Sequence, residues 1–233
     1  MRQVLLHSAG SCAGLFILES PRTLVNHADF GRGIEVSLLI ARHGQTDWNL
    51  EQRWQSVSDI PLNAEGQNQA ARLAALLEAR GCVPHRLISS PLSRAQKTAH
   101  ILGAAMGCEV ETDPTLIELD LGQFEGRLES ELRAEDPAGY DAWRESCYLL
   151  AAPGGETIHD VASRIAGLIA DLDDQKGDIL IVGHQGVNMA IKARLSDCFT
   201  QECLTSFRQS NDEIEVWQLD PAKRIGHIKA GND

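Results

Sequence analysis

The sequence is poor in basic residues, poor in aromatics and free of long apolar runs. Its 233 residues contain 21 Lys and Arg against 33 Asp and Glu, a formal net charge of −12. This balance argues against broad contact with nucleic acid or an anionic membrane, because both attract basic surfaces. No stretch approaches the ~18 consecutive apolar residues of a transmembrane helix. We therefore expect a soluble, cytoplasmic protein without nucleic-acid or membrane partners.

Cysteine pairs with metal-type spacing are also missing. The cysteines are scattered along the chain without a CxxC pair, at Cys12, Cys82, Cys108, Cys147, Cys198 and Cys203. This pattern fits reduced thiols in a cytoplasmic protein better than a disulfide framework, and it argues against a zinc site. The sequence therefore predicts neither a metal nor a cofactor.

Length and composition indicate one globular domain of α/β size, because hydrophobic residues make up 43% and charged residues 23% of the chain. We place this domain at residues 36–233 and interpret residues 1–35 as an N-terminal extension, with disorder as one alternative. The apolar run at residues 12–18 makes a signal peptide the other alternative. It is short and has little positive charge before it, which disfavours a signal peptide.

Strand-like and helix-like segments alternate along residues 36–219. Strands are expected at residues 36–41, 86–89, 178–182 and 213–219, the last at a sheet edge. One helix is expected to begin after Asn63 and end at Gly81, and another to begin at Ser90 and Pro91 and end at Gly107. A third has its apolar positions at residues 158–172. The alternation predicts a three-layer α/β/α sandwich with a mainly parallel central sheet.

The segment 122–153 departs from this alternation. It is rich in Glu, Arg and aromatic residues and contains Pro137 and Gly139. We expect a helical insertion at the edge of the sheet that forms a lid.

Polar side chains follow three of the predicted strands. His43 follows the first strand, Ser89 and Ser90 with nearby Arg94 follow the second, and His184 follows a later one. Because the carboxyl ends of parallel strands share one edge, these groups are expected to meet there. An isolated Arg-His-Gly at a strand end would more often be a simple turn, so their coincidence carries the prediction.

Histidines and arginines without a metal motif suit phosphoryl transfer. Guanidinium groups bind phosphate oxygens bidentately, which makes Arg42 and Arg94 the expected clamps. A neutral imidazole attacks phosphorus when its other nitrogen is held by a backbone carbonyl, and His43 is the candidate nucleophile. Glu118, in an apolar setting that favours a protonated carboxyl, is the candidate proton donor, with Asp120 as its rival. A solvated loop carboxylate is the alternative interpretation of Glu118.

These residues resemble the histidine phosphatase superfamily, the phosphoglycerate mutase-like group. The similarity runs in order from about residue 36 to 219. It comprises Arg42-His43-Gly44-Gln45-Thr46-Asp47-Trp48-Asn49, Asp59 to Leu62 with Gly66, Ser90-Pro91-Leu92-Ser93-Arg94-Ala95 with Thr98 and Ala99, Glu118 with Gly122, Glu125 and Gly126, and Gly183-His184.

The resemblance implies a role for each matching residue. It implies that His43 forms a phosphohistidine, that Glu118 donates the proton, and that the phosphoryl group is held by Arg42, Arg94 and His184. It places Asn49 in the same pocket and Gln55 at a phosphate- or substrate-binding position. The chain departs from the pattern at Ser56 and Gln185, where glycine is usual, so we expect the Gln185 side chain to reach the substrate.

The resemblance favours a metal-independent phosphatase that acts on a small phosphorylated metabolite, because the insertion is shorter than in the glycolytic mutases. A phosphoglycerate mutase-type phosphoryl transferase is the alternative. A non-catalytic phosphoester-binding protein is a third hypothesis, which the presence of both histidines disfavours. The leaving group and the oligomeric state, including a homodimer, stay open.

Overall fold

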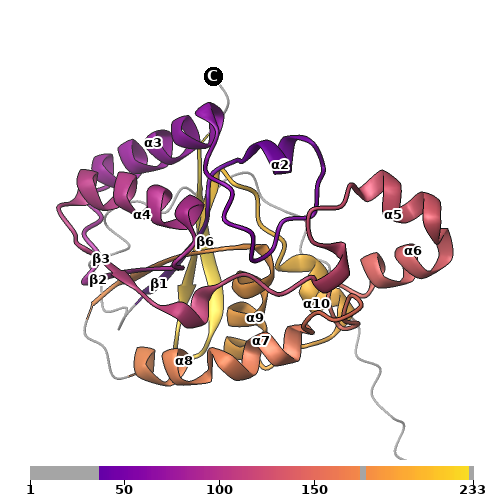
Figure 1. Ribbon diagram of the computed structural model, residues 1–233. Coiled ribbons are helices and arrows are strands. Elements are labelled where there is room, and N and C mark those ends of the chain that lie inside the picture. The colour runs from indigo at the N-terminus through magenta and orange to yellow at the C-terminus, as the bar shows by residue number, and fades with distance from the viewer. Residues whose placement is uncertain (1–36, 174–176, 231–233) are drawn as a thin grey trace, which may run out of the picture.

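The computed structural model describes residues 37–173 and 177–230, and its centre is a six-stranded sheet in the order β3-β2-β4-β1-β5-β6 (Figure 1). The strands are β1 (Ser37–Arg42), β2 (Arg86–Ser89), β3 (Val110–Thr112), β4 (Ile179–Gly183), β5 (Glu213–Gln218) and β6 (Lys223–Lys229). Strands β3, β2, β4 and β1 are parallel, β5 is antiparallel to β1, and β6 is antiparallel to β5. The predicted mainly parallel sheet is confirmed.

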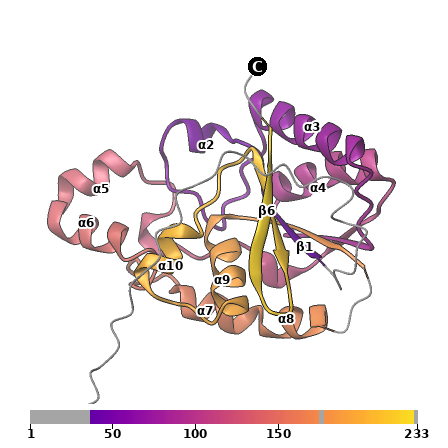
Figure 2. The same ribbon diagram turned by 180° about the vertical axis from the view of Figure 1, so that it is seen from behind.

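Helices cover both faces of the sheet (Figures 1 and 2). They are α2 (Asp47–Leu50), α3 (Ala64–Ala79), α4 (Ser93–Met106), α5 (Glu129–Glu135), α6 (Pro137–Glu145), α7 (Ile158–Arg164), α8 (Ala166–Asp173), α9 (Gln185–Leu195) and α10 (Gln201–Ser206). Helices α3 and α4 lie on one face, and α7, α8 and α9 lie on the other. The three-layer prediction is confirmed. None of the helices within the described ranges is long and apolar enough to cross a membrane.

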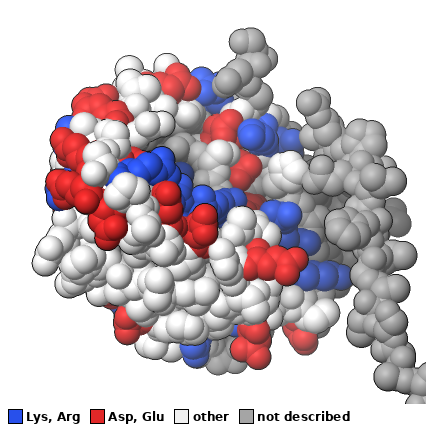
Figure 3. Space-filling model, turned by 90° about the vertical axis from the view of Figure 1, so that its right-hand side faces the viewer, with Lys and Arg blue, Asp and Glu red and all other residues white. Residues whose placement is uncertain are grey.

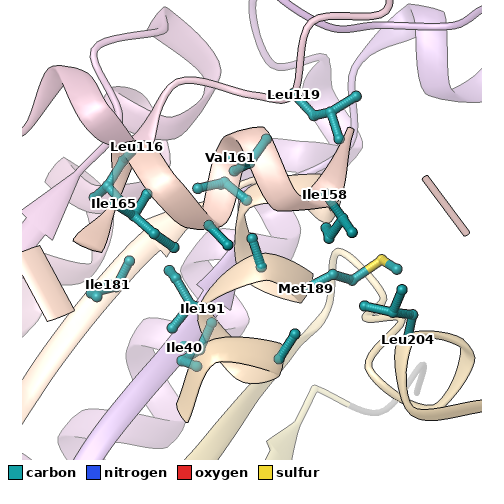
Figure 4. Packing of buried hydrophobic residues seen from close by; sticks show 14 of the residues in the cluster. Ile40, Leu116, Leu119, Ile158, Val161, Ile165, Ile181, Met189, Ile191 and Leu204 are labelled. Atoms are coloured by element: carbon teal, nitrogen blue, oxygen red, sulfur yellow. The ribbon is translucent and has the colours of Figure 1, made fainter. Parts of the chain in front are cut away.

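Each sheet face has its own apolar core because successive side chains of a strand point to opposite faces. In β1, Leu38 and Ile40 belong to one core, whereas Leu39 and Ala41 belong to the other. Figure 4 shows the first of these cores, where Ile40 lies with residues of α7 and α9. Full burial of one such aliphatic side chain stabilises the fold by about 1.5–3 kcal/mol.

The predicted helix ends are confirmed in part. Asn63 caps α3 by accepting a hydrogen bond from the Gly66 N–H at 2.8 Å. The second helix begins at Ser93 rather than at Pro91, with Leu92 as its N-cap. The predicted Ser90 cap is wrong because the Ser90 hydroxyl instead pairs with the ring of His184 at 2.7 Å. The apolar stretch 158–172 forms two helices rather than one, which meet at Ile165.

Strand β5 is an interior strand, so its predicted edge position is wrong. It pairs with β1 on one side and with β6 on the other. Glu213 and Glu215 made the segment look half-solvated, but Glu215 is buried and forms an ion pair with Lys192 at 2.7 Å. The polar sequence of β6 gave little sign of the strand that covers this edge.

The insertion forms α5 and α6, which project from one end of the sheet (Figure 1). An aromatic cluster joins them to the rest of the fold, with Trp143 at its centre. Its ring lies 4.9 Å from Trp54, 4.8 Å from Phe124 and 6.0 Å from Tyr148 between centroids. The predicted N-terminal extension, residues 1–35, lies outside the described residues.

Helix α10 is tied to the preceding turn by a disulfide between Cys198 and Cys203, whose Cα atoms are 6.1 Å apart. The prediction that the cysteines are reduced thiols is therefore wrong for this pair. The prediction considered only CxxC and metal-type spacings. Cys198 and Cys203 are five positions apart in the sequence, and the turn and the start of α10 bring them within bonding distance. Cys82, Cys108 and Cys147 are free thiols.

Candidate active site

The end of β1 places His43 in a buried position, and the next residue, Gly44, lies against helix α3. Its Nδ1 lies 2.7 Å from the carbonyl oxygen of Gly44. A carbonyl only accepts, so Nδ1 donates and the lone pair of the neutral ring is on Nε2. Gly44 is needed because a Cβ there would lie 2.3 Å from the backbone oxygen of Gly66. Close approach to α3 thus explains this glycine.

Burial keeps the imidazole of His43 neutral. Desolvation is the largest cause that lowers the pKa of His43 well below 6.5, and the positive charges of Arg94 and Arg42 lower it further. A neutral imidazole with a free Nε2 is the nucleophilic form. The site therefore holds His43 in that form at neutral pH.

His184 follows β4, the neighbour of β1, and its ring centroid lies 5.0 Å from that of His43. Arg94 Nε donates to His184 Nδ1 at 3.2 Å, so the ring proton of neutral His184 is on Nε2, which donates to Ser90 Oγ. Burial, followed by the charge of Arg94, lowers the pKa of His184 well below 6.5. The three strand ends that the sequence singled out meet here.

Arg94 is fully buried behind the two histidines. Its Nη1 and Nη2 donate to the carbonyl oxygens of Ser58 at 2.8 Å and Ser56 at 2.6 Å. The Gln55 amide, with its oxygen toward Arg94, accepts from Nη1 at 2.9 Å and shares the single Nε–H with His184, also at 2.9 Å. Burial lowers the pKa of Arg94 to about 10, so the guanidinium stays charged at neutral pH. Arg94 thus supplies positive charge next to His184 rather than forming part of the pocket wall.

Arg42 does line the pocket, and only part of its guanidinium is engaged. Nη1 donates to Gln185 Oε1 at 3.3 Å and to the carbonyl oxygen of Gln209 at 3.1 Å. Its Nε is buried and has no partner in the described structure, and the same holds for Nε2 of Gln185. Arg42 and Gln185 both line the pocket beside His43, each with an N–H group that no protein atom accepts from.

Glu118 lies at the N-terminus of α9. Its carboxyl oxygens accept hydrogen bonds from the backbone N–H groups of Leu119 at 2.8 Å, Gly186 at 3.1 Å and Val187 at 3.0 Å. These three donors fix the position of the carboxyl group and leave one of its roughly four lone-pair sites for a proton. Asp120, the rival acid, accepts from the Gly122 N–H at 2.8 Å and is not part of the pocket wall.

These groups surround a pocket of about 310 Å³. Of the sequence-predicted residues, those that line it are Arg42, His43, Asn49, Gln55, Glu118 and Gln185. Arg94 and His184 lie behind this wall, joined to it through Gln55 and the ring of His43. Asn49 also holds the local backbone, because its Oδ1 accepts from the Thr46 N–H at 3.2 Å.

Several wall residues had escaped the sequence analysis. They come from the insertion and from the segment after α10, and they include Arg144, Tyr148, Arg208 and Asn211. Asn211 Nδ2 donates to the carbonyl oxygen of His43 at 2.6 Å. No local pattern marks these positions, because they reach the pocket only through the packing of the insertion against α10. On the face in Figure 3, Lys and Arg side chains gather between groups of Asp and Glu, although the chain as a whole is acidic.

The chain matches known proteins over most of its length. The family model of the histidine phosphatase superfamily (branch 1) matches residues 38–229. Probable phosphoglycerate mutase GpmB from an Enterobacter species is 36% identical over 214 residues, covering 84% of this chain and 96% of that protein. The protein of the same name from Cronobacter sakazakii is 30% identical over the same shares.

Solved structures with phosphatase names share the fold. A mycobacterial glucosyl-3-phosphoglycerate phosphatase in complex with VO3 has a TM-score of 0.71 and 32% identity, covering 78% of this chain and 92% of that one. A putative α-ribazole-5′-P phosphatase from Escherichia coli K-12 has a TM-score of 0.67 and 30% identity, covering 78% of this chain and 90% of that one. The family model spans residues 38–229, which include both predicted histidines and parts of all six strands, so the chain belongs to the histidine phosphatase superfamily.

Proposed function

We propose that this protein hydrolyses phosphomonoesters of small metabolites through a phosphohistidine at His43, without a metal. The observation that carries the proposal is the hydrogen bond from His43 Nδ1 to the Gly44 carbonyl, which leaves the Nε2 lone pair on the wall that Arg42 and Glu118 also line. Phosphatase names among the similar structures support the same reaction class.

In the first step, His43 Nε2 attacks phosphorus in line with the ester oxygen. The N–P bond forms, the P–O ester bond breaks, and protonated Glu118 gives its proton to the leaving oxygen. Arg42 binds the transferring oxygens with its free N–H groups. Arg94 and His184 stabilise the charge that develops on the phosphoryl group from behind His43. Asn49, Gln55 and Gln185 complete the binding set.

In the second step, water replaces the alcohol. Glu118 is now a carboxylate, held in position by its three backbone donors, and it takes a proton from water as the oxygen attacks phosphorus. The N–P bond breaks, inorganic phosphate leaves, and Glu118 again carries its proton. The enzyme is therefore restored after one turnover, with His43 free and Glu118 protonated.

A mutase is the second candidate, and the names of the curated relatives favour it. A mutase hands the phosphoryl group of the same intermediate to a second substrate hydroxyl instead of to water. The phosphatase names among the similar solved structures favour the phosphatase, but the two reactions share every step up to the phosphohistidine.

The test measures inorganic phosphate release in excess EDTA from a panel of phosphomonoesters that includes 3-phosphoglycerate and α-ribazole phosphate, with the isomerised phosphoglycerate scored in the same samples. We expect steady phosphate release that His43→Ala abolishes and that His100→Ala, a change at an exposed histidine of α4, preserves. Isomerised product without phosphate release would instead establish the mutase. If neither product forms, the result favours a binding protein. Turnover by the His43→Ala variant would refute His43 as the nucleophile.

A further inference from the structure

The pocket extends beyond the reaction centre to a second group of side chains. Arg144 at the end of α6, Tyr148 just after it, and Arg208 between α10 and β5 also line it. We call these three residues the outer wall. The mechanism proposed above uses none of them, although they present two positive charges and a phenol to whatever fills the pocket.

The two outer-wall arginines contact an aromatic ring and a thiol rather than a carboxylate. The Arg144 guanidinium lies over the Trp54 ring at 5.3 Å from its centroid, and Arg208 Nη2 lies 3.4 Å from the thiol sulfur of Cys147. Neither forms an ion pair with any Asp or Glu of the described residues. By contrast Arg53, on the same pocket, pairs with Glu51 at 3.1 Å. Arg144 is half-buried and Arg208 is exposed, and two guanidinium groups without a carboxylate partner on one pocket are suited to an anionic ligand.

Tyr148 is directed into the pocket by unusual backbone geometry. Cys147 and Tyr148 have φ of 53° and 69°, a left-handed conformation that side chains other than glycine seldom adopt. Such conformations persist where the surrounding structure holds them, and they are frequent at ligand sites. Contacts with Thr205 and Arg208 hold Cys147, and the Ile158 N–H donates to the Tyr148 carbonyl at 2.8 Å.

The Tyr148 phenol adds a neutral hydrogen-bond donor between the charged groups. Burial raises the pKa of Tyr148 to about 12, with the negative charge of Glu118 as the second cause. The hydroxyl therefore keeps its proton at neutral pH and donates to an acceptor. An anion placed against the outer wall would meet two guanidinium groups and this hydroxyl.

We propose that the outer wall binds a second anionic group, a carboxylate or a phosphate, on the alcohol half of the substrate. The proposal rests on the proposed function, and it narrows the substrate class to phosphomonoesters whose leaving group is itself anionic. The transferred phosphoryl group lies at His43 and Arg42, and the second anion lies between Arg144 and Arg208. Each pocket arginine without a carboxylate partner then has an anion to bind: Arg42 binds the phosphoryl group, and Arg144 and Arg208 bind the second anion.

The test compares substrates that differ only in the second charge. 3-Phosphoglycerate carries a carboxylate where glycerol 3-phosphate carries a hydroxymethyl group, so the ratio of their kcat/KM values isolates the outer wall. We expect the wild type to favour 3-phosphoglycerate, and we expect Arg144→Ala and Arg208→Ala each to lower this ratio about tenfold. Arg194→Ala, an exposed arginine in the last turn of α9, is the matched control and should keep the wild-type ratio.

A second pair, fructose 1,6-bisphosphate against fructose 6-phosphate, shows whether the favoured anion is a phosphate instead of a carboxylate. A wild-type ratio near one for both pairs, or ratios that the Arg144 and Arg208 changes leave intact, would overturn the outer-wall proposal while leaving hydrolysis established. If no ester is turned over, the proposed function fails, and the outer wall is then tested by measuring the binding of the same compounds by calorimetry. A binding preference for the doubly anionic compound that Arg208→Ala removes supports the outer wall, and equal binding refutes it.

Discussion

The buried pair Lys192–Glu215 provides the sharpest test of how the fold supports the site. Lys192 Nζ donates to Glu215 Oε1 at 2.7 Å and to the carbonyl oxygen of Phe207 at 2.8 Å, and Trp217 Nε1 donates to Glu215 Oε2 at 2.9 Å. Burial lowers the pKa of Lys192, which the charge of Glu215 opposes. The bond to Phe207 anchors the segment that continues to Gln209, whose carbonyl holds Arg42.

Lys192→Met should destabilise the protein strongly. The side chains of Lys192 and Glu215 are 0% and 2% exposed, so the change leaves a carboxylate buried without its main partner. Breaking one side of such a pair costs about 3–5 kcal/mol. For a domain of this size, that cost corresponds to a fall of roughly 6–20 °C in Tm. The double change Lys192→Met with Glu215→Leu should recover at least ~2 kcal/mol, because it removes the uncompensated charge.

Urea unfolding followed by circular dichroism measures these free energies, with Lys97→Met on the exposed surface of α4 as the control, expected within about 0.5 kcal/mol of the wild type. A Lys192→Met protein within about 1 kcal/mol of the wild type would refute the reasoning. So would a double variant less stable than the single one, because burial of the lone carboxylate would then not be the source of the loss.

Two further predictions concern the titrating and proton-transfer groups. Burial lowers the pKa values of His43 and His184, so below pH 6.5 the folded state binds fewer protons than the unfolded state. The free energy of unfolding should therefore be steady above pH 6.5 and fall as the pH drops below 6.5. The two groups together set a slope of up to about 2.7 kcal/mol per pH unit. Urea unfolding between pH 5 and 7.5 checks this, and an equal slope in the variant carrying His43→Gln and His184→Gln would contradict it. Glu118→Gln should slow glycerol 3-phosphate hydrolysis about 10²–10⁴-fold and p-nitrophenyl phosphate hydrolysis far less, since only the alcohol of glycerol 3-phosphate, the poor leaving group, needs the proton. Equal losses for the two substrates would argue against Glu118 as the acid, and so would a similar pattern in Asp120→Asn.

Local patterns in the sequence were sufficient for much of the scaffold. The apolar run Leu38 to Ala41 predicted a buried strand, and the N-cap at Asn63 predicted the start of α3. Both signals act within a few residues, through side-chain alternation and through a hydrogen bond to the next turn. Neighbouring parallel strands then brought His43, Ser90 and His184 together as expected, since the carboxyl ends of such strands share one edge.

Long-range packing overruled the local patterns elsewhere. Glu215 suggested a half-solvated edge strand until Lys192, on another element, supplied its counter-charge. Ser90 had the chemistry of a helix cap, but its hydroxyl pairs with His184, 94 positions away in sequence. In each case one side chain had two partners of similar chemistry, and only the tertiary structure decided between them.

The sequence by itself determined the alternating architecture, the two histidines at strand ends and the arginines and carboxylate that accompany them, because these depend on local periodicity and on strand direction. The tertiary structure alone decided that Arg94 lies behind the histidines with its donors on backbone carbonyls, and that Arg144, Tyr148 and Arg208 complete the pocket. These residues come from segments whose approach depends on how the insertion packs against α10. Local sequence carries no record of that packing, which arises from contacts between residues about 60 positions apart.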